Sequence, residues 1–158
     1  MSIENLNNVI GTFHDFELVS AEQQGTELTL GFENCWNEMN DPEKPFMKLN
    51  FTFDNCQLIE CTYYVNTNEK DQNGHWKYND LTTKQVNELP NLELSAQSFE
   101  IVDGVHNLHC NGYGDIDGGI LKLRFNSPEF RIFDEHSNQL ELEDYRQLHE
   151  RWWNFVGS

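Results

Sequence analysis

The sequence has few basic residues. Its 158 residues include 10 Lys and Arg against 27 Asp and Glu, so the formal net charge is −17. The excess is spread along the chain, because residues 1–79 carry 13 acids and 4 bases and residues 80–158 carry 14 acids and 6 bases. Such a surface repels phosphate backbones, which argues against DNA or RNA as a partner. It attracts a basic partner, although the same charge could serve solubility alone.

Long apolar runs and secretion signals are also missing. No segment approaches the ~18 consecutive apolar residues of a membrane-spanning helix. Residues 1–12 lack the basic start and the apolar run of a signal peptide. The cysteines form no C-x-x-C pair, so we interpret all of them as reduced thiols. These absences predict a cytoplasmic protein with no membrane partner. The cysteines are Cys35, Cys56, Cys61 and Cys110.

Several sequence signatures of enzymes are absent. The sequence contains neither G-x-S-x-G nor H-E-x-x-H, so it shows no nucleophile elbow and no helical zinc motif. Its glycine-rich stretch, 112–119, has no lysine at the offset of a phosphate-binding loop. From the sequence we therefore predict no enzyme, no catalytic residue, no metal site and no cofactor.

Aromatic residues are abundant. Phe, Tyr and Trp make up 13% of the chain, which is enough to build a core in a protein of this length. We expect one domain over residues 1–158. Apolar and polar residues alternate in many short runs separated by Gly, Asn, Asp or Pro, which is typical of antiparallel hairpins. The expected strands are 16–21, 26–34, 46–54, 56–65, 92–102, 105–111, 120–125 and 130–133.

Two regions depart from this alternation. Residues 66–74 have the composition of a loop, and 75–89 is ambiguous, with a short helix expected from Thr82, which would cap it, to Leu89 before Pro90. Residues 140–156 change to a period of three to four and predict an amphipathic helix. We therefore predict a mainly β protein, with about eight antiparallel strands in a curved sheet or sandwich and a C-terminal helix packed on it.

The stretch 12–20, TFHDFELVS, places His14 beside Asp15. Such a pair can orient an imidazole for base catalysis. In extended backbone, however, neighbouring side chains point to opposite faces, so the two residues could share a site only in a turn. We favour a structural role, in which one of them bonds local backbone at the start of a strand. Contact with a partner and an enzyme based on His14 are the alternatives.

Two other stretches contain residues that could bind metal. In 106–110, HNLHC, His106 and Cys110 share a strand face but lie roughly 13 Å apart by strand rise, which is too far for one ion. In 114–119, GDIDGG, the Glu that completes a calcium loop is missing. We interpret the first stretch as a strand with Cys110 inside and the second as a turn.

The segments 12–33 and 46–60 resemble the opening strands of small β-rich immunity proteins from bacterial polymorphic toxin loci. The similarity lies in an aromatic-His-Asp start, a strand, a glycine turn, an L-x-L-x-F strand and the following hairpin. The resemblance implies a protein that binds and neutralises a partner toxin in the cytoplasm of the producing cell. It implies no catalytic residue.

We therefore expect a protein-binding module that occludes a cognate, basic protein such as a toxin, with acidic side chains meeting Lys and Arg and tryptophans as anchors. The alternatives are a small-ligand or carbohydrate-binding β module that uses exposed tryptophans, and an uncharacterised structural or interaction domain. The residues expected to contact the partner are Trp36, Glu38, Asp41, Glu43, Asp71 and Trp76.

Overall fold

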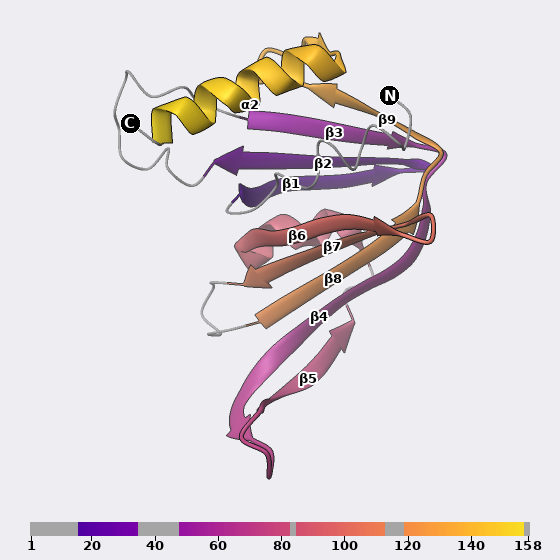
Figure 1. The fold of residues 1–158 in the computed structure, drawn as a ribbon. Helices are drawn as coiled ribbons and strands as arrows, with labels where there is room; N and C mark the ends of the chain where they lie inside the picture. Colours follow the sequence, from indigo (N-terminus) through magenta and orange to yellow (C-terminus); the bar gives the residue numbers. More distant parts are fainter. Residues whose placement is uncertain (1–15, 35–47, 83–84, 113–118, 157–158) are drawn as a thin grey trace.

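The fold is one curved antiparallel sheet with a helix at one end (Figure 1). This computed structural model describes residues 16–34, 48–82, 85–112 and 119–156. Within these ranges the sheet has ten strands, in the order β10-β9-β3-β2-β1-β6-β7-β8-β4-β5. The strands are β1 (Phe16–Gln24), β2 (Glu27–Asn34), β3 (Lys48–Asp54), β4 (Gln57–Lys70), β5 (Trp76–Thr82), β6 (Leu94–Val102), β7 (Val105–Gly112), β8 (Gly119–Asn126), β9 (Glu129–Phe133) and β10 (Gln139–Leu140).

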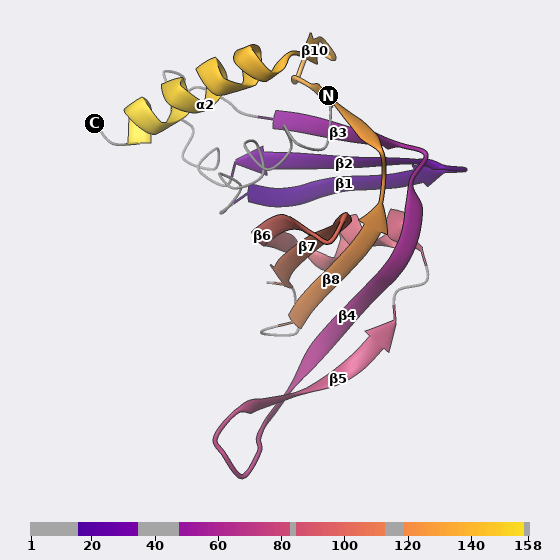
Figure 2. The same cartoon turned by 45° about the vertical axis from the view of Figure 1, so that its right-hand side comes forward.

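The sheet consists of two halves that join over a short distance. Strands β1 and β6 pair through three residue pairs, from Phe16 with Ala96 to Leu18 with Leu94. The chain passes between the halves twice, from β3 into β4 and from β8 into β9. Figures 1 and 2 show both connections at the same end of the molecule, where the sheet bends.

The inner faces of the two halves meet in one aromatic core. Phe53 of β3 lies in the middle, with its ring centroid 4.7 Å from that of Phe125 on β8 and 6.0 Å from that of Phe99 on β6. On β3 it alternates with outward polar residues as the sequence predicts, and the inward residues Leu49, Phe51 and Phe53 are almost fully buried. Burial of these rings stabilises the bend, because each removes a large apolar area from water.

The C-terminal helix α2 (Leu142–Val156) lies at the β9–β3 end of the sheet (Figure 2). Tyr145 is buried, and Leu142 and Leu148 are partly buried against the core. The backbone N–H of Glu141 donates to the Asp144 carboxylate at 2.9 Å, which satisfies one free donor at the start of the helix. The expected amphipathic helix is therefore confirmed.

The structure corrects three details of the predicted strand pattern. Strand β4 continues to Lys70, through part of the expected loop 66–74. Among the described residues β5 and β10 are additional strands, so the sheet has ten there where the sequence predicts about eight. The expected helix from Thr82 is wrong, because Thr82 ends β5 and the residue before the 3-10 helix η2 (Val86–Leu92) is Gln85. This helix also continues through Pro90.

Candidate functional site

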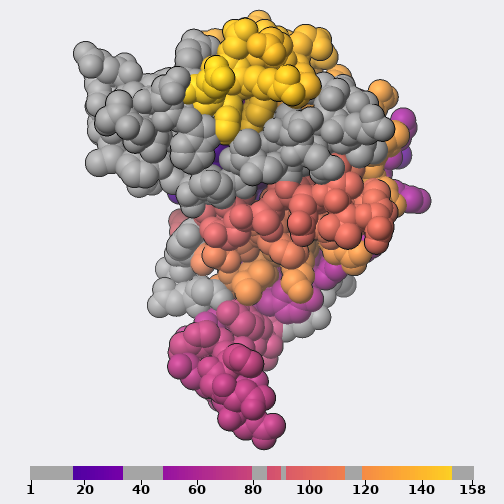
Figure 3. Space-filling model, viewed as in Figure 1, coloured from indigo at the N-terminus to yellow at the C-terminus, as the bar shows by residue number. Residues whose placement is uncertain are grey.

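The most prominent surface feature is the hairpin formed by β4 and β5, which extends away from the body (Figure 3). The two strands pair from Thr62 with Thr82 to Asn66 with Tyr78, and Lys70 pairs with Trp76 beyond an irregular stretch. The far half of β4 is exposed or only partly buried. A partner could therefore reach this hairpin without displacing any part of the core.

Asp71 builds the turn at the end of the hairpin. Its carboxylate accepts hydrogen bonds from the backbone N–H of Asn73 at 2.8 Å and of His75 at 2.9 Å. Its own N–H donates to the carbonyl of His75, and the N–H of Gly74 donates to its carbonyl. This is an Asx-type turn, in which the side chain substitutes for a backbone acceptor. The predicted partner-binding residue Asp71 thus has a structural task of its own.

Trp76 and Tyr78 form an exposed aromatic pair on β5. They are 49% and 39% exposed, and because they are two residues apart they share one face of the strand. The ammonium group of Lys70 lies 4.6 Å from the centre of the Trp76 ring, which holds the indole against the hairpin. A large aromatic surface kept rigid at low entropic cost is the usual anchor of a protein interface.

The structure brings two of the six predicted partner-binding residues together. Asp71 and Trp76 both lie on the β4–β5 hairpin. Trp36, Glu38, Asp41 and Glu43 fall outside the described residues, as do His14 and Asp15. Sequence reasoning missed Tyr78, although the alternation in W-K-Y would have revealed it once 76–82 was recognised as a strand.

Most of the cations in the described ranges are already engaged within the molecule. Arg131 contacts Asp54 at 2.8 Å and Glu27 at 3.1 Å, and the hydrogen bonds that its guanidinium donates to Asp54 are the main reason that the pKa of Arg131 is raised. Pairing of the few bases with acids leaves the surplus of carboxylates facing solvent, so the surface stays strongly negative. The other pairs with Lys or Arg are Lys48–Glu33, Lys77–Glu69, Arg124–Glu60 and Arg146–Glu143.

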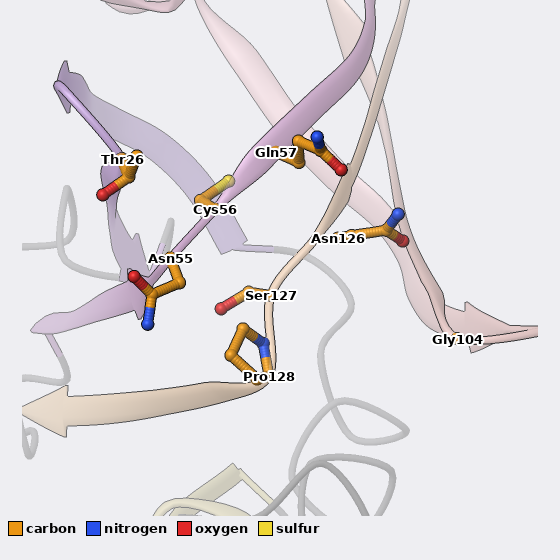
Figure 4. Close-up of a pocket in the computed structure, with 8 residues that line it drawn as sticks. All are labelled: Thr26, Asn55, Cys56, Gln57, Gly104, Asn126, Ser127 and Pro128. Atoms are coloured by element: carbon orange, nitrogen blue, oxygen red, sulfur yellow. The ribbon is translucent and has the colours of Figure 1, made fainter.

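A hollow of about 430 Å³ lies where the chain passes between the halves of the sheet (Figure 4). Gln57 and Asn126 point to one side of it, whereas Asn55 points to the other, so the amides do not converge on one point (Figure 4). The hydroxyl of Ser127 lies within hydrogen-bond distance of the carbonyls of Asp54 and Glu129. The Ser127 hydroxyl therefore bonds the local backbone.

The buried thiols are poor nucleophiles. Cys56, Cys61 and Cys110 are free and buried, as the sequence predicts for reduced thiols. Burial raises the pKa of Cys56 and Cys61 to about 11 and that of Cys110 to about 12. A thiol reacts as its thiolate, so these three groups are protonated and unreactive at neutral pH.

His106 lies inside the core rather than at a site. It shares the inner face of β7 with Leu108 and Cys110, as the sequence predicts. Across the ranges that the structure describes, no three His, Cys, Asp or Glu side chains are arranged to hold a metal ion. In these ranges no helix combines the length and the apolar composition that crossing a membrane requires. The described surface thus offers an exposed aromatic hairpin as its candidate site.

No family model, curated protein or solved structure matches this chain. The resemblance to immunity proteins therefore stays a prediction.

Proposed function

We propose that this chain is a cytoplasmic protein-binding module whose partner is a basic protein. The observation that carries the proposal is the β4–β5 hairpin, which presents Trp76 and Tyr78 to solvent on one face. Aromatic side chains are enriched at the energetic centres of protein interfaces. The net charge of −17 speeds encounter with a positively charged partner. Occlusion of a toxin is the form of this function that the resemblance implies.

The test uses the protein encoded by the reading frame directly upstream, produced together with this chain. We expect a complex whose association rate falls between about 0.1 M and about 1 M salt, because the Debye length shortens from about 10 Å to about 3 Å. We also expect that Trp76→Ala weakens the complex by at least about tenfold, as for an anchor residue. Stopped-flow and calorimetric titrations measure these two effects.

The matched control is Val102→Ala, which truncates a residue that is 50% exposed on a different hairpin. It should leave binding unchanged. For the toxin form, production of this chain should also restore growth of cells that produce the neighbouring protein. A complex that is insensitive both to salt and to Trp76→Ala would contradict the proposal.

The exposed aromatic pair also favours a second candidate, a carbohydrate-binding module. Trp76 and Tyr78 lie two residues apart on one face and could together stack on the apolar face of a sugar ring. A screen of oligosaccharides by tryptophan fluorescence distinguishes the two functions. A ligand that changes the emission of the parent chain but not of Trp76→Ala would favour the carbohydrate over the protein partner.

A further inference from the structure

The two outermost strands of the sheet, β10 and β5, differ in length. Strand β10 has two residues, and the chain continues from it into α2. Strand β5 has seven residues, and within the described part of the chain β4 is its only strand partner. The outer edge of β5 therefore carries unpaired N–H and C=O groups, which are a template for a further strand.

Elsewhere in the sheet an open edge is covered. Strand β1 continues past Leu18, where its pairing with β6 ends. There the N–H of Gln23 donates to the side-chain carbonyl of Asn87 in η2 at 2.9 Å, so the 3-10 helix takes the place of the missing strand. Strand β5 has no such cover in the described ranges, and its sequence, WKYNDLT, contains no proline. Among the devices that protect edges β5 has one lysine, Lys77, and an irregular pairing beside it, but an edge of this length that no other described element covers is uncommon in natural sheets.

The surroundings of β5 favour a basic segment as its partner. The paired part of the hairpin, residues 62–82, contains three acids, Glu69, Asp71 and Asp80, and two bases, Lys70 and Lys77. The hairpin is therefore only slightly negative, and the main attraction for a basic segment is the net charge of −17 of the whole molecule. Two copies of the chain repel each other, whereas a strand that carries Lys or Arg is attracted to this edge. Trp76 and Tyr78 would then contact alternate side chains of the added strand.

We infer that β5 accepts an extended, basic segment of the partner protein as an additional strand. This inference rests on the proposed function and names its binding mode. Backbone hydrogen bonds to the free edge would hold the segment, and the exposed face of Trp76 and Tyr78 would select its side chains.

The probe is a peptide of roughly eight residues, a typical strand length, that alternates lysine and threonine. Its control is the same peptide with an N-methyl group on every amide nitrogen, which keeps the charge and removes the backbone donors of both strand edges. We expect the methylated peptide to bind at least about tenfold more weakly, because several hydrogen bonds are lost. Hydrogen exchange at the amides of Trp76–Thr82 should slow only with the unmodified peptide.

The outcomes separate this inference from the proposed function. Equal binding of both peptides would overturn strand addition and leave a charge-driven protein-binding module. If neither peptide binds while the neighbouring protein does, strand addition is again wrong and the proposed function stands. If the chain forms dimers and the unmodified peptide dissociates them, the edge pairs with a second copy of the chain. That outcome would overturn the choice of a basic segment. Loss of peptide binding in Trp76→Ala, but not in Val102→Ala, would support strand addition at β5.

Discussion

At the scale of single residues, His106 is the most unusual side chain of the core. It is 1% exposed, and its ring stacks on Phe125 with 4.8 Å between centroids and lies 5.4 Å from the ring of Phe53. Neither ring nitrogen makes a hydrogen bond of good geometry. Burial lowers the pKa of His106 to about 4, and the nearby backbone of Phe125 offsets only part of this effect. The imidazole is therefore neutral at pH 7.

This predicts a specific loss of stability in acid. Above pH 6.5, His106 is neutral both folded and unfolded, so it adds no pH dependence. As the pH falls from 6.5 towards about 4, the unfolded chain binds a proton that the folded chain refuses. The free energy of unfolding should decrease by up to about 3 kcal/mol from this group. Urea titrations at several pH values measure the decrease.

The variant His106→Leu removes the group that binds the proton. Its free energy of unfolding should therefore depend less on pH than that of the parent between pH 6.5 and about 4. The control is His109→Gln, a half-buried neighbour on the opposite face of β7. It should keep the dependence of the parent. If His106→Leu and the parent lose stability in parallel, the buried imidazole is not the cause. Imidazole resonances followed by NMR give an independent reading of the pKa.

The Tyr63 side chain packs closely against two glycines that lie opposite each other on β7 and β8. Gly112 pairs with Gly119, and a methyl group at either position would collide with the Tyr63 hydroxyl. At Gly112 the next atom, Cζ, lies 3.0 Å away, whereas at Gly119 the ring carbon itself also collides. An aromatic ring that covers strand glycines in this way compensates for their missing side chains.

We predict that Gly112→Ala and Gly119→Ala each destabilise the protein by about 1–3 kcal/mol, as overpacking does. Removal of the hydroxyl by Tyr63→Phe should restore most of the loss in Gly112→Ala but not in Gly119→Ala, since only the first clash is confined to the oxygen. Double-mutant cycles from urea unfolding measure this difference. Equal rescue at both positions would show that Tyr63 moves away from the glycines.

At the scale of elements, the turn of the β4–β5 hairpin depends on one carboxylate. Asp71 accepts hydrogen bonds from two backbone N–H groups, of Asn73 and His75. We predict that Asp71→Ala loosens the hairpin locally by about 1–2 kcal/mol, since two donors lose their acceptor. Faster hydrogen exchange in β4 beyond Asn66 and in β5 would show this.

The isosteric variant Asp71→Asn keeps an oxygen acceptor and should retain most of the protection from hydrogen exchange. It therefore separates the role of Asp71 in the turn from the role of its charge. Unchanged exchange in Asp71→Ala would mean that the strand pairing alone holds the hairpin. If Asp71→Asn weakens partner binding while the hairpin stays protected, the charge of Asp71 contributes to the interface as the sequence predicts.

At the scale of the whole molecule, self-repulsion is the dominant electrostatic effect. The chain has 27 acids and 10 bases, and the ion pairs seen in the structure lie mainly on the surface, where each contributes little. We predict that salt stabilises the fold, because screening weakens the repulsion more than it weakens the few attractions.

The urea midpoint should rise when sodium chloride increases from about 0.01 M to about 0.2 M, which shortens the Debye length from about 30 Å to below 10 Å. A sugar at equal osmolarity is the control for effects other than screening. A midpoint that falls with salt would show that attractive pairs such as Arg131 with Asp54 outweigh the net charge.

The sequence alone was enough to predict most strands, because alternation is a local property: Leu28, Leu30 and Phe32 must face the same way whatever lies opposite. The amphipathic period of the helix and the inward position of Cys110 were predictable for the same reason. The free thiols followed from cysteine spacing. The negative surface followed from composition.

Only the tertiary structure decided which strands lie side by side and which edge stays open. Pairing of β3 with β9 or of β4 with β8 joins segments far apart in the chain, and no local pattern specifies it. Strand β5 was missed because its sequence, WKYNDLT, combines two aromatic residues with Lys, Asn and Asp, which are depleted in strands. The proposed edge site therefore follows from the strand order, because an edge exists only where a sheet ends.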